Sequence, residues 1–347
     1  MRKWTPGEWT MTIDRRHLLA GLGAAAGSPA FPARARQDDD FPPPLTEIPS
    51  DRLPAVRADY LRKSAALFAA APDLSACRAG VLKGGEKQKA LATVNDVRAR
   101  HGLGAVAYDL AFDDQVMQTA LMMAANNRLD HNPGGDWACY SAAGHDGAAS
   151  SNLHGGAEAS PDGFLNFLTT PQIVAGWITD ARNALADNIG HRRLLLDPFL
   201  KHIAFGRYSG LYGGGRLTSS AALKVIFADM WSDGHAGPFV AWPYGDYPAH
   251  YFDPAAFLSF SVVADLADKT GNEAVDFRGT RVTVTPRGGA PLALSRLSSD
   301  NAYYGLPNNI QFLAAGIMPG VAYEVSLRHV GVKGVDSDFS YGFRIVA

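Results

Sequence analysis

Two histidines and one aspartate are the side chains of this sequence whose types and order best suit chemistry. His131 follows a predicted helix, Asp180 closes a Trp-Ile-Thr-Asp run, and His191 opens a short predicted helix. Two imidazoles and one carboxylate are enough ligands to hold a zinc ion with one open position. The aspartate could equally orient a histidine or pair with a neighbouring arginine, and the histidines could bond to the backbone. These residues therefore predict either a metal site or a polar cleft.

The common catalytic motifs are missing from the sequence. It contains no Gly-x-Ser-x-Gly elbow, His-Glu-x-x-His pair, phosphate-binding loop or Cys-x-x-Cys pair. Ser151 as a nucleophile beside a histidine lacks both the elbow and an oxyanion motif. Glu158 is a candidate base if the protein is a zinc-dependent hydrolase. The residues thus favour a binding cleft over a complete catalytic site.

The elements expected to position these residues are helices followed by strands. A periodic apolar pattern and Pro or Gly at the ends predict the helices, and a long polar stretch over 132–170 predicts a loop. Two apolar runs, 203–206 and 224–228, predict strands, so that residues 73–236 are expected to form an α/β sandwich. The predicted helices span residues 53–71, 88–101, 113–128, 171–186 and 191–196.

The last hundred residues show a different pattern. Short alternating runs separated by Gly and Pro turns predict a small antiparallel β-sandwich, which begins near residue 246. The predicted strands span residues 257–263, 281–285, 310–313, 323–327 and 341–346. The fold expected for the whole chain is therefore an α-β-α sandwich followed by a β-sandwich.

Several short motifs occur one after another along the first of these regions. They are Asn95-x-x-Arg98, His101-Gly102-Leu103, Tyr108-Asp109, Leu129-x-His131, Ser151-Asn152-Leu153, Trp177-Ile178-x-Asp180, Gly190-His191-Arg192 and Phe205-Gly206. Their order resembles the CAP superfamily of cysteine-rich secretory proteins, venom antigens and plant pathogenesis-related proteins, which has many secreted bacterial members. The resemblance covers roughly residues 77–245.

This resemblance implies an α-β-α sandwich with a cleft lined by two histidines and two acidic residues. Carried over by position, the histidines are His131 and His191, and one acidic residue is Asp180. The second acidic residue normally stands directly before an Asn-Leu or Asn-Ile pair, where this chain has Ser151. The family's metal set is therefore incomplete here, unless Glu158 or His154 replaces the missing carboxylate.

The first 35 residues have the features of an export signal. A basic segment with Arg15-Arg16 precedes Leu18-Leu19 and a run of Ala and Gly, which resembles the twin-arginine type. An acidic, proline-rich linker and a leading helix are expected over 36–72, the CAP-like region over 73–245 and the β-sandwich over 246–347. The mature protein is accordingly expected in the periplasm or outside the cell.

Composition limits the remaining classes. The chain has 347 residues and a formal net charge of −2, without the basic excess of a nucleic-acid binder. No run of 18 apolar residues predicts a transmembrane helix. Its two cysteines, Cys77 and Cys139, are either two buried thiols or one bridge made after export, which would contribute roughly 4 kcal/mol to stability in the chain-entropy model.

The expected function is therefore binding. We expect an exported protein that recognises a cell-envelope or extracellular ligand (glycan, peptide or lipid) through the cleft without catalysis. The alternative is a zinc-dependent hydrolase, in which His131, His191 and Asp180 hold the metal.

Overall fold

The computed structural model describes residues 52–158, 164–181, 183 and 188–347. The expected export signal and most of the linker lie outside these residues. The helices within them are α1 (Leu53–Ala66), α2 (Gly84–Arg100), α3 (Asp113–Asn126), α4 (Ala142–Ala149), α5 (Thr170–Thr179) and α6 (Gly190–Leu195). None of these helices combines the length and the apolar character that a membrane crossing requires.

A four-stranded sheet forms the centre of the first region. Its order is β3-β5-β6-β4, with β5 antiparallel to β6 and β6 antiparallel to β4. Only the short β3 pairs in parallel, with the first two residues of β5. The strands are β3 (Ala107–Tyr108), β4 (Ser151–Ala157), β5 (His202–Tyr212) and β6 (Arg216–Lys224). A separate pair, β1 (Phe68–Ala70) with β2 (Val81–Leu82), follows α1.

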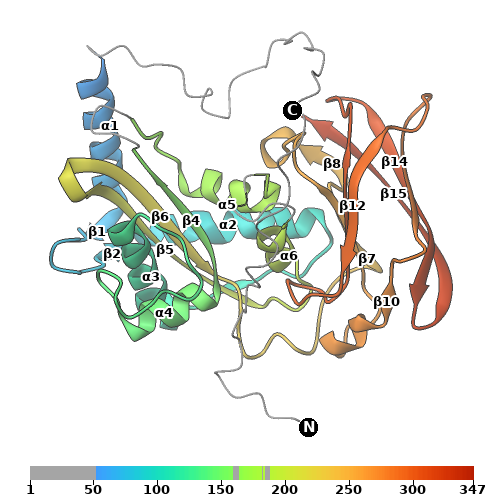
Figure 1. The fold of residues 1–347 in the computed structure, drawn as a ribbon, viewed down its shortest axis with the longest axis horizontal. Helices are drawn as coiled ribbons and strands as arrows, with labels where there is room; N and C mark the ends of the chain where they lie inside the picture. The colour runs from blue at the N-terminus through green and yellow to red at the C-terminus, as the bar shows by residue number, and fades with distance from the viewer. Residues whose placement is uncertain (1–51, 159–163, 182, 184–187) are drawn as a thin grey trace, which may run out of the picture. The chain divides into compact units, whose positions relative to one another are not determined.

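Helices cover both faces of this sheet, which makes the predicted α-β-α sandwich (Figure 1). On one face, Val116 and Met122 of α3 pack with Leu153 of β4 in a buried cluster. On the other face, Trp177 of α5 meets Phe205 of β5, with ring centroids 6.5 Å apart. Side chains alternate between the faces of a strand, so neighbouring residues of β4 and β5 serve opposite helical layers.

The C-terminal region contains two sheets. One has the order β12-β13-β9-β7, and the other has β10-β14-β15-β8 with β11 also paired to β14. Phe260 of β9 and Tyr341 of β15 stack between them at 6.0 Å. The strands are β7 (Phe239–Trp242), β8 (Gly245–Pro248), β9 (Leu258–Val262), β10 (Val275–Asp276), β11 (Arg281–Pro286), β12 (Leu294–Asp300), β13 (Asn309–Ala314), β14 (Ala322–Val332) and β15 (Val335–Val346).

Two features of this region differ from a purely antiparallel sandwich that starts at residue 246. Strand β8 pairs in parallel with β15, and the first strand of the sheets, β7, already begins at Phe239. One buried apolar cluster also contains residues of both regions, from Leu67 to Ile345. The division of the chain into separate domains stays a prediction.

Several boundaries differ from the sequence-based expectation. The helix predicted over 53–71 ends at Ala66, before β1. The helix predicted over 171–186 ends at Thr179, because Asp180 takes a left-handed backbone conformation with φ of 49°. The strand predicted over 224–228 ends at Lys224. The stretch 132–170, predicted as a loop, contains both α4 and β4.

The helix α4 was hidden because its apolar side chains are small. Its sequence is Ala-Ala-Gly-His-Asp-Gly-Ala-Ala, without the large apolar residues that mark a helix face. Small residues suit this position because α4 lies close to α3. A methyl group added at Gly147 would stand 2.1 Å from the Thr119 hydroxyl, and one at Gly144 would stand 3.3 Å from Met122.

The two cysteines form a disulfide. Cys77 and Cys139 are bonded, with their Cα atoms 5.1 Å apart. This decides between the two expectations for the pair in favour of the bridge. It ties the segment after β1 to the segment that leads into α4.

Candidate functional site

His131 lies on the segment that joins α3 to α4. Its Nδ1 is 2.8 Å from the backbone oxygen of Ala148 in α4. A carbonyl oxygen only accepts, so Nδ1 carries the hydrogen and donates it. In a neutral imidazole the other nitrogen, Nε2, is then a hydrogen-bond acceptor. No other described residue hydrogen-bonds to this Nε2.

His191 is also held through its Nδ1, but by a side chain instead of a backbone oxygen. It is the second residue of α6, and its Nδ1 lies 2.9 Å from Oδ1 of Asp180. Asp180 is buried, and its Oδ2 accepts the backbone N–H of Arg192 at 3.3 Å. Since a carboxylate accepts, the Nδ1 of His191 also donates. Its Nε2 likewise has no hydrogen-bond partner within the described ranges.

Strand β4 brings a third histidine to this place. His154 lies close enough to His191 for the two rings to interact electrostatically, and His191 also acts on His131. Neither ring nitrogen of His154 has a partner among the residues that the structure describes. The three imidazoles, His131, His154 and His191, are called the histidine cluster below.

Desolvation by the surrounding protein favours the neutral form of two of these rings. Desolvation lowers the pKa of His131, and it lowers the pKa of His154 to about 4, with the Arg207 guanidinium and His191 adding to the shift. A neutral imidazole offers a lone pair that an imidazolium lacks. His131 and His154 therefore present hydrogen-bond acceptors at neutral pH.

Ser151 and Asn152 stand at the start of β4. The buried Oγ of Ser151 has no hydrogen-bond partner in the described chain, and neither does the buried Oδ1 of Asn152. The amide nitrogen of Asn152 donates to the backbone oxygen of His191 at 3.0 Å. This bond links the first turn of α6 directly to β4.

Glu158 lies beyond the far end of the same strand. One of its carboxylate oxygens is bound by Arg57, and the other accepts the backbone N–H of Leu217 at 2.6 Å. Glu158 comes directly after Ala157, the last residue of β4, whereas Ser151 is the first residue of that strand, a distance of roughly 20 Å along an extended strand. The structure does not bring Glu158 to the histidine cluster.

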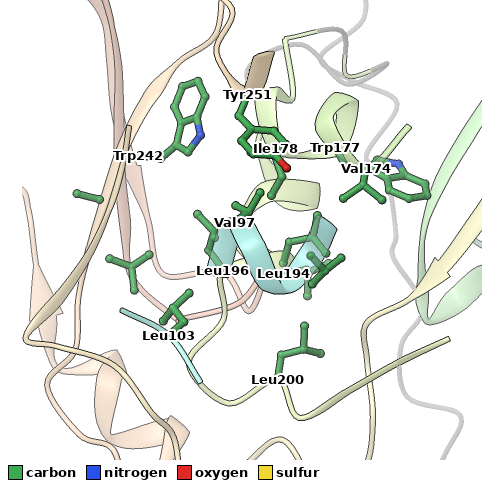
Figure 2. Close-up of a cluster of buried hydrophobic side chains, with 14 of the residues drawn as sticks. Val97, Leu103, Val174, Trp177, Ile178, Leu194, Leu196, Leu200, Trp242 and Tyr251 are labelled. Atoms are coloured by element: carbon green, nitrogen blue, oxygen red, sulfur yellow. The ribbon is translucent and has the colours of Figure 1, made fainter. Parts of the chain in front are cut away.

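A buried arginine fixes the helix that carries His191. The Nε of Arg192 donates to Ile178 O at 2.6 Å, and its Nη1 donates to Phe257 O at 2.6 Å. Its guanidinium lies 3.6 Å from the centre of the Trp242 ring. Leu194 and Leu196 then enter the apolar cluster shown in Figure 2. The side chain of Arg192 thus bonds to backbone oxygens. The backbone N–H of Arg192 donates to the carboxylate of Asp180.

The donor set can be compared with what zinc requires. A catalytic zinc site uses three protein ligands and keeps one position open. Within the described ranges, no group of three or more His, Cys, Asp or Glu side chains is placed to hold a metal. Asp180, the third expected ligand, hydrogen-bonds to His191 instead. The described residues therefore do not fit a catalytic zinc centre.

The sequence motifs indicated His154 only as a possible replacement for the missing carboxylate and gave Asn152 no role of its own. Both were undervalued because residues 132–170 were expected to be a loop. Once β4 is recognised, the two-residue spacing puts Asn152 and His154 on one face of a strand.

One family model matches the chain. It is described as CAP, the cysteine-rich secretory protein family, and it matches residues 91–220. The match includes all three histidines of the cluster together with Asp180. No curated protein matches the chain.

Proposed function

Because residues 91–220 make this chain a member of the CAP superfamily, we propose that it binds a cell-envelope or extracellular ligand at the histidine cluster without catalysing a reaction. The observation that carries the proposal is the shared state of His131 and His191. In both rings Nδ1 is occupied by a partner within the protein, so that Nε2 is the acceptor of the neutral imidazole. Both rings are therefore oriented for contact with something that donates hydrogen bonds.

The available acceptors favour a hydroxyl-rich ligand. Besides the imidazole nitrogens, the Asn152 carbonyl oxygen is without a partner among the described residues. A buried acceptor that has no hydrogen-bond partner costs about 1–3 kcal/mol. A ligand that donates a hydrogen bond to such a group removes this cost. Sugar hydroxyls are suitable donors, whereas an acyl chain has none. Among glycan, peptide and lipid, we therefore favour a glycan.

Binding without catalysis is supported by the surroundings of the two other candidate residues. The Ser151 hydroxyl has no histidine or other base as a hydrogen-bond partner in the described chain. Glu158 is occupied by Arg57 and Leu217 at the far end of β4. Together with the unsuitable zinc donor set, this leaves Ser151 without the base that a nucleophile needs and Glu158 engaged away from the histidine cluster.

Export is part of the same proposal. Residues 1–35 lie outside the described structure, so the support is the sequence itself, with Arg15-Arg16 before an apolar run. We expect the pair change Arg15→Lys with Arg16→Lys to keep the protein inside the cell. Normal export of that variant would remove the twin-arginine interpretation while leaving the binding proposal intact.

The binding proposal is tested with solubilised cell-wall glycan as the probe in calorimetric titration of the purified protein. Replacing His131 or His191 by Gln should weaken binding by tenfold or more, since one lost hydrogen bond costs about 1.4 kcal/mol. The matched control is His329→Gln, an exposed histidine on β14. Glycan binding that is equal in all variants contradicts the proposal.

The same samples test the hydrolase alternative. Elemental analysis should find no stoichiometric zinc, and prolonged incubation should release no new reducing ends from the glycan. Zinc bound one to one and lost in both histidine variants, together with released reducing ends, would establish the hydrolase instead.

A further inference from the structure

We propose a second binding site at the free edge of strand β5, where an extended acidic polypeptide segment of another molecule adds to the central sheet as a further strand. This site shares no residue with the histidine cluster. It goes beyond the proposed function and does not depend on it. Four features of the structure lead to it.

The first feature is the short reach of β3 along β5. Strand β3 pairs only with His202 and Ile203, whereas β5 continues to Tyr212. On its other side β5 pairs with β6 over its length, from Ala204 to Tyr212, without an irregularity. Within the described residues, the edge of β5 that faces away from β6 therefore has no neighbouring strand beyond Ile203.

The second feature is the direction of the backbone groups along that edge. Phe205 uses both its N–H and its oxygen toward β3, by bonding to the Tyr108 hydroxyl at 3.0 and 3.2 Å. In a regular strand every second residue points its N–H and C=O to the same side. Ser209 and Leu211 consequently direct these groups away from β6.

These groups are largely unpaired. The oxygen of Leu211 accepts the Tyr208 hydroxyl at 2.7 Å. The N–H of Leu211 and both backbone groups of Ser209 have no hydrogen-bond partner within the described chain. An unpaired strand edge is a template for another strand, and proteins usually cover it. The complement of alternating donors and acceptors is an extended polypeptide backbone.

The third feature is an open pocket along the same edge. It has a volume of about 960 Å³, and the backbone at Ser209 and Leu211 forms part of its wall. Helix α1 bounds it with Leu61 and Ala65, and α3 reaches it with Ala125. Because α1 and α3 cover opposite faces of the sheet, the pocket lies at the edge between the two helical layers. An added strand would direct alternate side chains toward these two walls.

The fourth feature is the charge beside the pocket. Arg216, at the β5–β6 turn, lies over the ring of Tyr212, which lines the pocket, and it has no acidic partner in the described chain. The ion pair on the pocket wall, Arg78 with Asp73, adds no net charge. The excess of positive charge favours an acidic segment.

The probe is the synthetic peptide acetyl-Val-Glu-Val-Glu-Val-Glu-amide, titrated into the full chain. We expect binding with a Kd below about 1 mM, with the amide resonances of Ser209 and Leu211 shifted and their hydrogen exchange slowed. Two matched peptides act as controls. N-methylation of every second amide should abolish binding, and replacing Glu by Lys should weaken it at least tenfold.

A variant removes the edge donor in the protein itself. Leu211→Pro deletes the unpaired N–H without breaking a bond to β6, and proline is tolerated on strand edges. It should lose binding, while Leu211→Ala should keep it. Should Leu211→Pro fail to fold, the N-methylated peptide still decides the question. Equal binding of methylated and unmethylated peptides, or no binding at about 1 mM, overturns the proposal.

Other occupants would appear in the same exchange experiment without peptide. Slow exchange of Ser209 and Leu211 at every protein concentration would show that another part of this chain covers the edge. Slow exchange that appears only at high protein concentration would show a second copy. Either result overturns the assignment to a separate acidic polypeptide.

Discussion

His131 and His191 present the same nitrogen but are held by very different surroundings. His131 is exposed on the segment between α3 and α4, and one backbone oxygen orients its ring. His191 starts a helix whose next residue, Arg192, is fully buried and bonded to α5 and to the C-terminal sheets. The first side of the site depends on a loop, and the second depends on the packing of the whole chain.

This difference indicates how the site tolerates change. Substitutions behind His191 should affect folding and binding together, because the ring, Asp180 and Arg192 share one buried network. Substitution of His131 itself should affect binding with little effect on folding. The expectations below test this contrast, from the largest effect to the smallest.

The largest effect is expected at Arg192. Arg192→Met removes a buried guanidinium that binds Ile178, Thr179 and Phe257 and leaves their oxygens unpaired. Losing one partner of such a network costs about 3–5 kcal/mol. Urea unfolding measures this loss, and Arg278→Met, at an exposed arginine, should stay within about 0.5 kcal/mol of the parent. If Arg192→Met lowered the free energy of unfolding only slightly, the His191 side would not depend on packing more than the His131 side does.

The disulfide is expected to be the main stabiliser of the His131 side. Cys77→Ser combined with Cys139→Ser opens a loop of sequence separation 62 and should lower the free energy of unfolding by about 2–4 kcal/mol. Thermal unfolding of the oxidised parent and the double variant measures it. Since the His191 network is untouched, the variant should retain the Asp180–His191 hydrogen bond. Loss of that bond would show that the two sides are coupled.

A smaller change is expected at Asp180. Asp180→Asn keeps the size of the side chain but removes the charge that accepts from His191 and from Arg192. We expect a loss of about 1–3 kcal/mol in stability and at least tenfold weaker glycan binding, because the His191 ring is no longer held in one tautomer. Unchanged binding with reduced stability would mean that Asp180 serves the fold alone.

The pH dependence of stability tests the packing near Arg192. Burial and the nearby Arg192 lower the pKa of His101 to about 3, below its usual 6.5. As pH falls below 6.5 the unfolded chain binds a proton that the folded chain does not, so stability falls with pH. Between pH 7 and 5.5 this amounts to about 1 kcal/mol. His101→Leu should flatten this part of the stability curve, and an identical curve would contradict the assignment.

The smallest effect on stability is expected at His131. His131→Gln should change the free energy of unfolding by less than about 0.5 kcal/mol, because the side chain lies at the surface. Paired urea titrations of parent and variant would show it. A loss above 2 kcal/mol would place His131 in the folding core and remove the contrast with His191.

The sequence predicted much of the fold because long periodic segments such as α3 carry their own pattern. It did not reveal α4 or β4, whose small and polar residues gain meaning only from the helix and strands around them. The motif residues His131, Asp180 and His191 were found through their order along the chain. Their division of roles was not readable, since the Asp180–His191 bond depends on a left-handed residue at the end of α5. The edge of β5 was also hidden, because an unpaired backbone leaves no trace in residue types.

The central claim is that both imidazoles offer Nε2 as an acceptor. Nitrogen-15 NMR of the histidine rings tests it most directly, because it separates protonated from unprotonated ring nitrogens at pH 7.5. We predict that each neutral ring carries its hydrogen on Nδ1, and that glycan shifts both Nε2 signals. Hydrogen on Nε2 of either ring, or glycan binding that leaves both signals unmoved, would contradict the account.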